Sequence, residues 1–141
     1  MRKDFLIYCI LLPGWICTAF VHAETNVDSL KALLCDEKVR HQYNLRIKIG
    51  DYYMVDSPSG AAKYYKEAQL IARKLKIDTM EARAFTYLGL SKLETDDYPD
   101  SENYLRNALE IYEKSGLQDK IAMVNYKLGK NFHSFYNTLV R

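Results

Sequence analysis

The sequence predicts an all-α protein built from repeated pairs of helices, and three observations lead to this fold class. Apolar residues recur three and four positions apart rather than in alternation, which is the period of an α-helix. Only six glycines and three prolines occur in 141 residues, so few tight turns interrupt the helices. Leu88-Gly89 recurs as Leu128-Gly129 forty positions later, with another helix signature between the two copies. Such an internal repeat indicates stacked helical hairpins.

Residues 1–23 are predicted to be a signal peptide. Two basic residues precede an apolar run over residues 5–21, and small residues suit cleavage before Glu24. An uncleaved membrane anchor is the alternative, because the run approaches the ~20 residues that span a bilayer, although Pro13-Gly14 interrupts it. We therefore expect an exported protein, periplasmic or extracellular, with a membrane contact only if this segment stays uncleaved.

Residues 24–36 are predicted to form a leading helix in which Val27, Leu30 and Leu34 make an apolar stripe. Cys35 would be the one cysteine left after cleavage, so no internal disulfide is expected in the mature chain. Its place beside the apolar stripe predicts a buried side chain.

Residues 37–141 are predicted to form two and a half hairpins. The two complete hairpins cover about residues 37–77 and 78–117, and the half hairpin covers about residues 118–138. With the leading helix, this makes six helices after the signal peptide.

The first hairpin is predicted to begin with a helix over residues 37–54. Its apolar face consists of Leu45, Ile49, Tyr52 and Tyr53. The second helix begins at Pro58, because proline suits the first turn of a helix, and Ser57 is the expected cap.

The second hairpin is predicted from its start signals. Asp78, with Glu81 three residues later, resembles a capping box at the start of a helix. The turn Asp97-Tyr98-Pro99 opens the next helix, which ends near Gly116. The last helix starts near Asp119.

The residues at these positions resemble those of tetratricopeptide-repeat (TPR) proteins. That family has Leu-Gly in the first helix of each repeat and small residues at two set positions of the second. The central repeat matches with Leu88, Gly89, Ser101 and Ala108. The resemblance covers residues 28–136 and implies a right-handed α-solenoid of antiparallel hairpins, with about two and a half repeats.

Two features depart from the family pattern. The period is about forty residues instead of thirty-four, and Lys92 stands where an aromatic residue is usual. Long repeats of this kind are similar to exported regions of bacterial sensor and regulator proteins. The resemblance thus also implies an alternative, a truncated periplasmic input region of a signalling or transcription-regulatory protein.

The resemblance implies a non-catalytic module that binds a protein or peptide on the concave side of the solenoid. Mapped by the Leu-Gly register, the concave side would present Asn44, Ile47, Asp51, Arg83, Thr86, Leu90, Leu93, Met123, Tyr126, Lys130 and His133. The family's clamp for a C-terminal carboxylate needs Lys and Asn where Ile47 and Asp51 stand, so that ligand is not expected.

Charge alternates along the repeats, since residues 38–76 are net basic and residues 78–119 are net acidic. Two interpretations remain open, solvated faces or a basic surface for an acidic partner or lipid headgroups. That surface would comprise Lys63, Lys66, Arg73, Lys74 and Lys76. Nucleic acid is not expected as a partner, because no basic motif with interleaved aromatic residues is present.

No pattern for catalysis, a metal or a cofactor is present in the sequence. It lacks a Gly-rich phosphate loop, a cysteine pair, a helical histidine pair and a nucleophile motif. An enzyme built on helical pairs would need a converging acid, base or metal set, and the candidates for such a set are Asp51, Arg83 and His133.

The C-terminal helix is strongly apolar near its end. This composition predicts either further repeats in a longer chain or self-association through the C-terminal face. The residues concerned are Phe132, Phe135, Tyr136, Leu139 and Val140.

Overall fold

The computed structural model describes residues 15–140, and the side chains of residues 35–140. Over these residues it consists of five α-helices without a strand, which confirms the all-α prediction. They are α2 (Trp15–Asp56), α3 (Pro58–Leu75), α4 (Asp78–Leu93), α5 (Tyr98–Lys114) and α6 (Gln118–Leu139). The chain divides into two compact units, Met1–Lys38 and Val39–Arg141.

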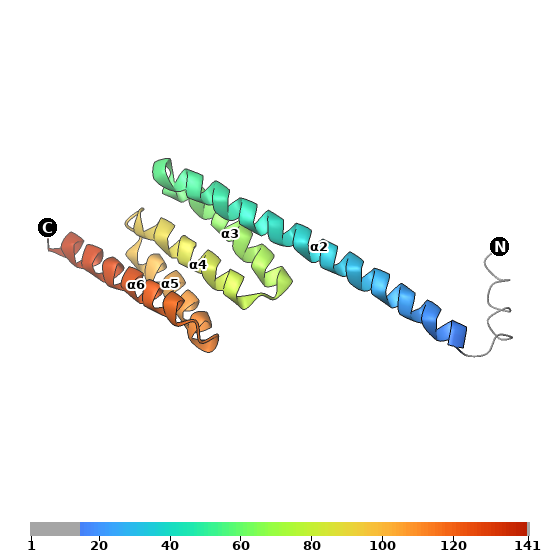
Figure 1. The fold of residues 1–141 in the computed structure, drawn as a ribbon. Coiled ribbons are helices and arrows are strands. Elements are labelled where there is room, and N and C mark those ends of the chain that lie inside the picture. The colour runs from blue at the N-terminus through green and yellow to red at the C-terminus, as the bar shows by residue number, and fades with distance from the viewer. Residues whose placement is uncertain (1–14, 141) are drawn as a thin grey trace. The chain divides into compact units, whose positions relative to one another are not determined.

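The second unit is a series of antiparallel helices that pack side by side (Figure 1). α4 packs against α3, α5 and α6, and α5 also packs against α6. Two hydrophobic clusters follow one another along the stack. The first holds Tyr43, Ile47, Tyr65, Ala68 and Leu88, and the second holds Leu105, Ala108, Tyr112, Val124 and Leu128. α4 contributes Leu88 to the first cluster and Ala82 to the second. The hairpins therefore form a continuous solenoid.

Glycines mark the points where the helices of a hairpin approach closely. A Cβ atom on Gly50 would overlap the ring of Tyr65, and one on Gly89 would lie 2.7 Å from Leu105 Cγ. A small side chain is also needed at Ser101, which is fully buried in this contact and whose hydroxyl donates to the Gly89 carbonyl at 2.8 Å. Close packing therefore explains the Leu-Gly register.

Lys92 stands where the TPR family usually has an aromatic residue, and its side chain links the two helices of the central hairpin. Its Nζ lies 2.7 Å from Asp97 Oδ2 and 3.0 Å from Asp100 Oδ2. Asp97 also caps α5, because its side chain accepts from the Asp100 amide. The hydrogen bond from Lys92 holds the pKa of the Asp97 carboxyl below its usual value.

We expect this link to make the stability of the hairpin sensitive to acid. Because the pKa of Asp97 is lower in the folded state, its contribution is present above the unfolded pKa of about 3.9 and is lost as the pH falls through the folded pKa. Urea unfolding at neutral and acidic pH should show a smaller acid-induced loss of stability in Lys92→Met than in the wild type. Lys66→Met, at an exposed position of α3, is the matched control and should behave as the wild type. Equal acid-induced losses of stability in all three proteins would show that the link between Lys92 and Asp97 does not stabilise the hairpin.

The structure corrects the prediction of two separate helices before Asp56. The predicted leading helix and the predicted helix over residues 37–54 are parts of one continuous helix, α2. No proline or glycine lies between Leu34 and Glu37 to separate them. The predicted burial of Cys35 is wrong, because its side chain is exposed. The α2 residues of the core begin further along, at Tyr43.

Two local predictions used the wrong residues. In α2 the core side chains are Tyr43 and Ile47, each 1% exposed, whereas Leu45 and Tyr52 are 48% and 76% exposed. The predicted capping box at α4 is absent, because Ile77 is the N-cap residue and makes no side-chain cap. The predicted cap Ser57 is confirmed, since its side chain accepts from the backbone amide three residues later, and Asp97 of the predicted opening turn caps α5 in the same way.

Glu81 has a different role from the predicted capping box. Its Oε1 accepts from Gln69 Nε2 at 2.6 Å and from Arg73 Nη2 at 2.9 Å. These bonds join α4 to α3, so the carboxylate satisfies the buried amide of Gln69 rather than its own helix end.

The predicted signal peptide lies largely outside the described residues, which begin at residue 15. Among the helices from residue 15 onward, none combines the length and the apolar character that a membrane crossing requires.

Candidate functional site

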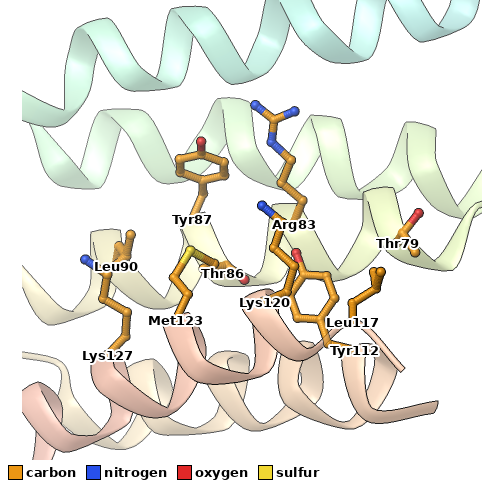
Figure 2. A pocket seen from close by; sticks show the side chains of 10 residues that line it. All are labelled: Thr79, Arg83, Thr86, Tyr87, Leu90, Tyr112, Leu117, Lys120, Met123 and Lys127. Atoms are coloured by element: carbon orange, nitrogen blue, oxygen red, sulfur yellow. The ribbon is translucent and has the colours of Figure 1, made fainter. Parts of the chain in front are cut away.

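A hollow of about 440 Å³ lies between α4, α5 and α6 and has one wall from each of these helices (Figure 2). Arg83 and Tyr87 extend from α4 toward α2, and Met123 and Lys127 project from α6. We call this space the α4–α6 hollow. Its lining consists of Thr79, Arg83, Thr86, Tyr87, Leu90, Tyr112, Leu117, Lys120, Met123 and Lys127.

A second hollow of about 430 Å³ lies between α2 and α4 and shares Arg83 with the first. We call it the α2–α4 hollow, and the two hollows together the groove. The α2–α4 hollow is lined by His41, Asn44, Leu45, Ile47, Lys48, Asp51 and Arg83. Because one arginine borders both spaces, a single extended ligand could contact both.

The α4–α6 hollow is basic. Its lining contains Arg83, Lys120 and Lys127 but no acidic side chain. None of these three cations belongs to a salt bridge formed within the described side chains, although six other lysines and arginines do. Arg83 and Lys120 are also exposed. Within the described side chains, the positive charge in this hollow therefore has no ion-pair partner.

A layer of tyrosines holds the groove side of α4 in place. The Tyr65 and Tyr87 rings stack with their centroids 5.0 Å apart, and the Arg83 guanidinium lies 5.7 Å from the Tyr87 ring centroid. The Tyr65 hydroxyl donates to Asp51 Oδ1 at 2.9 Å, so the one acidic side chain of the α2–α4 hollow already has a partner. Burial raises the pKa of Tyr65, as does this hydrogen bond. The phenol therefore stays protonated and keeps donating to Asp51.

Tyr43 fixes α2 to α4 from beneath the groove. It is 1% exposed, and its hydroxyl donates to the Met80 carbonyl at 2.8 Å. Burial raises the pKa of the Tyr43 phenol, so this donor is also retained. The walls of the groove are thus positioned by packed aromatic side chains.

The structure brings seven of the eleven predicted concave-side residues to the two hollows. The α2–α4 hollow receives Asn44, Ile47, Asp51 and Arg83, and the α4–α6 hollow receives Arg83, Thr86, Leu90 and Met123. Ile47 is 1% exposed and belongs to the core beneath the hollow.

The other four predicted residues line neither hollow. Leu93 is 5% exposed and packs inside. Tyr126 is 70% exposed, and His133 is exposed with its Nε2 3.1 Å from Asn137 Nδ2. Lys130 Nζ lies 3.7 Å from Glu94 Oε1. These four residues therefore lie outside the groove as the two hollows define it, and their predicted role in binding stays a prediction.

Nine groove residues were missed by the sequence mapping, but helical spacing could have found most of them. Thr79 lies one turn before Arg83 on α4. Lys120 and Lys127 lie three residues before and four residues after Met123 on α6. Extending each predicted helix face by one turn in both directions would have revealed the basic character of the groove. The missed residues are His41, Leu45, Lys48, Thr79, Tyr87, Tyr112, Leu117, Lys120 and Lys127.

The three residues named for the enzymatic alternative do not all line one hollow. Asp51 and Arg83 border the same hollow, but His133 does not. Among the described side chains, no group of three or more histidine, cysteine, aspartate or glutamate residues could hold a metal ion.

The arrangement of hairpins is similar to that in a solved protein. The crystal structure of the TPR domain of Arabidopsis FLU matches with a TM-score of 0.53 and 25% sequence identity, over 72% of this chain and 94% of that chain. The chain has a TPR-like fold. The TPR-like fold supports a protein–protein interaction module in general. No protein-family model and no curated protein matches the sequence.

Proposed function

We propose that the chain is a non-catalytic interaction module whose groove binds an acidic segment of a partner protein. The observation that carries this proposal is the set of three cations, Arg83, Lys120 and Lys127, around an otherwise uncharged hollow without an acidic residue. An acidic peptide would supply the missing negative charge, and its apolar side chains would contact Leu90, Met123 and the tyrosine rings.

The two hollows suit a peptide rather than a small compound. They lie on either side of Arg83, so a ligand that fills both must be extended or helical. Binding in such a groove relies on shape and on a few charged contacts. Arg83 would bind a carboxylate with its planar fork of donors, and the two lysines would add charge nearby.

A location outside the cytoplasm and a role as the input region of a signalling protein stay predictions of the sequence. The groove proposal requires neither, because it rests on residues of α2, α4, α5 and α6.

The proposal is tested by selecting ligands from a random peptide library displayed on phage. We expect the selected peptides to be rich in aspartate and glutamate and to bind less tightly as salt is raised, because salt screens charge. Neutral or basic selected peptides would contradict an acidic partner.

Binding of the selected peptides is then measured by fluorescence anisotropy with two matched triple variants. Arg83→Ala, Lys120→Ala and Lys127→Ala together should raise the dissociation constant by at least about tenfold, which corresponds to about 1.4 kcal/mol. Lys63→Ala, Lys66→Ala and Lys74→Ala together remove the same charge from exposed positions of α3. This triple variant should change the dissociation constant little. If the α3 variant loses binding and the groove variant does not, the partner binds the alternative basic surface.

A further inference from the structure

The outer face of α6 carries a stripe of exposed residues that runs along the helix. These residues recur at three- and four-residue spacing and therefore lie on one side of α6. We call them the α6 stripe: Ala122, Asn125, Gly129, Phe132, His133 and Tyr136. Phe132 and Tyr136 are 48% and 64% exposed, so large aromatic surfaces are uncovered. Large exposed aromatic side chains that gather on one uncharged helix face are typical of an interaction site.

The two preceding repeats show what covers the corresponding face of a helix. Gly50 on α2 is covered by Tyr65 of α3, and Gly89 on α4 is covered by Leu105 of α5. At Gly129 an added Cβ would meet no atom within 4 Å in the described part of the chain. The glycine that permits close approach of an antiparallel helix is thus present on α6, and the approaching helix is not supplied by residues 15–140.

We propose that α6 of a second copy of this chain covers the α6 stripe, in an antiparallel dimer whose two-fold axis passes beside Gly129. A two-fold interface uses the same patch on both copies, so the patch must complement itself. Ala122 and Tyr136 lie about two helical turns before and after Gly129. Antiparallel pairing at Gly129 therefore places the large Tyr136 of each copy opposite the small Ala122 of the other.

The α6 stripe presents no charge that would keep a second copy away. The α6 stripe contains no lysine, arginine, aspartate or glutamate, so two copies meet without repulsion between like charges. Lys130 is directed to Glu94, and Lys127 belongs to the lining of the α4–α6 hollow. The groove therefore stays open in such a dimer, and the dimer proposal does not depend on the proposed acidic partner.

The mass of the full chain in solution tests this inference. Sedimentation velocity from micromolar to several hundred micromolar protein should show a monomer–dimer equilibrium for the wild type. Ala122→Glu with Tyr136→Glu should raise the dimer dissociation constant by at least about tenfold. Tyr52→Glu with Leu70→Glu adds the same charge at exposed positions of α2 and α3 and should leave the equilibrium unchanged. A wild type that stays monomeric, or equal dissociation constants in the two variants, would overturn the proposal.

Cross-linking tests the register and does not depend on how the charged variants fold. With Cys9, Cys17 and Cys35 replaced by serine, Gly129→Cys should give a disulfide-linked dimer under mild oxidation, because the axis brings the two positions together. Arg106→Cys, at an exposed position of α5, should give none. Absence of the cross-link at position 129, or equal cross-linking at both positions, would show that the copies do not meet at Gly129.

Discussion

We expect Tyr65→Ala to lower the free energy of unfolding by about 3–5 kcal/mol, the range for removing a large aromatic side chain from a core. Tyr65 is 0% exposed, lies against Gly50 and stacks on Tyr87. Its loss would leave a cavity between α2, α3 and α4 and deprive Asp51 of a hydrogen bond. Since small domains are stabilised by only about 5–15 kcal/mol, the variant should unfold at a clearly lower urea concentration.

Two variants separate the contributions of this side chain. Tyr65→Phe removes only the hydroxyl and should cost about 0.5–1.5 kcal/mol, the usual net value of one hydrogen bond. Tyr52→Ala, at a side chain that is 76% exposed, should change stability by less than about 0.5 kcal/mol. A loss at Tyr65→Ala no larger than that at Tyr52→Ala would show that the first hairpin does not pack as described.

The same substitution at two glycines is expected to have opposite effects. Gly89→Ala should lower the free energy of unfolding by about 1–3 kcal/mol, because the new Cβ would lie 2.7 Å from Leu105 Cγ and 3.2 Å from the Ser101 carbonyl oxygen and force the helices apart. Gly129→Ala should raise it by up to about 1 kcal/mol, because alanine favours a helix more than glycine does and the position is open.

Urea unfolding of both variants in dilute solution, where association does not contribute, measures these effects. The difference depends only on whether a second helix covers the glycine, since both lie after a leucine in the first helix of a repeat. Destabilisation of similar size at both positions would contradict the open environment of Gly129.

The repeat register could be predicted from sequence because close packing restricts it to few residue types. A glycine and a serine at Gly89 and Ser101 suit the contact between α4 and α5, and the prolines at 58 and 99 mark helix starts. These signals are local or repeated, so a single sequence reveals them. The side chain that covers each glycine, Tyr65 or Leu105, also lies in the expected second helix.

The face of α2 could not be predicted, because its apolar residues occupy more than one side. Tyr52 and Leu45 are as apolar as Tyr43 and Ile47, but only the latter two face α3 and α4. Contacts from distant helices decide between such faces, and no local pattern contains that information. The burial of Cys35 was wrongly predicted for the same reason, because a stripe of apolar residues does not show whether another helix covers it.

Tyr126 shows how the surroundings of an equivalent repeat position change at the last described helix. Thr86, forty residues earlier, is 4% exposed and borders the α4–α6 hollow with Tyr112 of the following helix. Tyr126 occupies the corresponding place on α6, but no following helix is described, and it is 70% exposed. Equivalent sequence positions thus face different surroundings, because burial in a solenoid depends on the next hairpin.

The central claim, that the groove at Arg83 is the binding surface, is tested most directly by amide chemical shifts of the labelled chain during titration with a selected acidic peptide. We predict shifts concentrated on the groove residues of α4 and α6, including Arg83, Thr86, Met123 and Lys127. The amides of Lys63 and Lys66 on α3 should stay in place. Shifts confined to α3, or to the α6 stripe, would contradict the proposal.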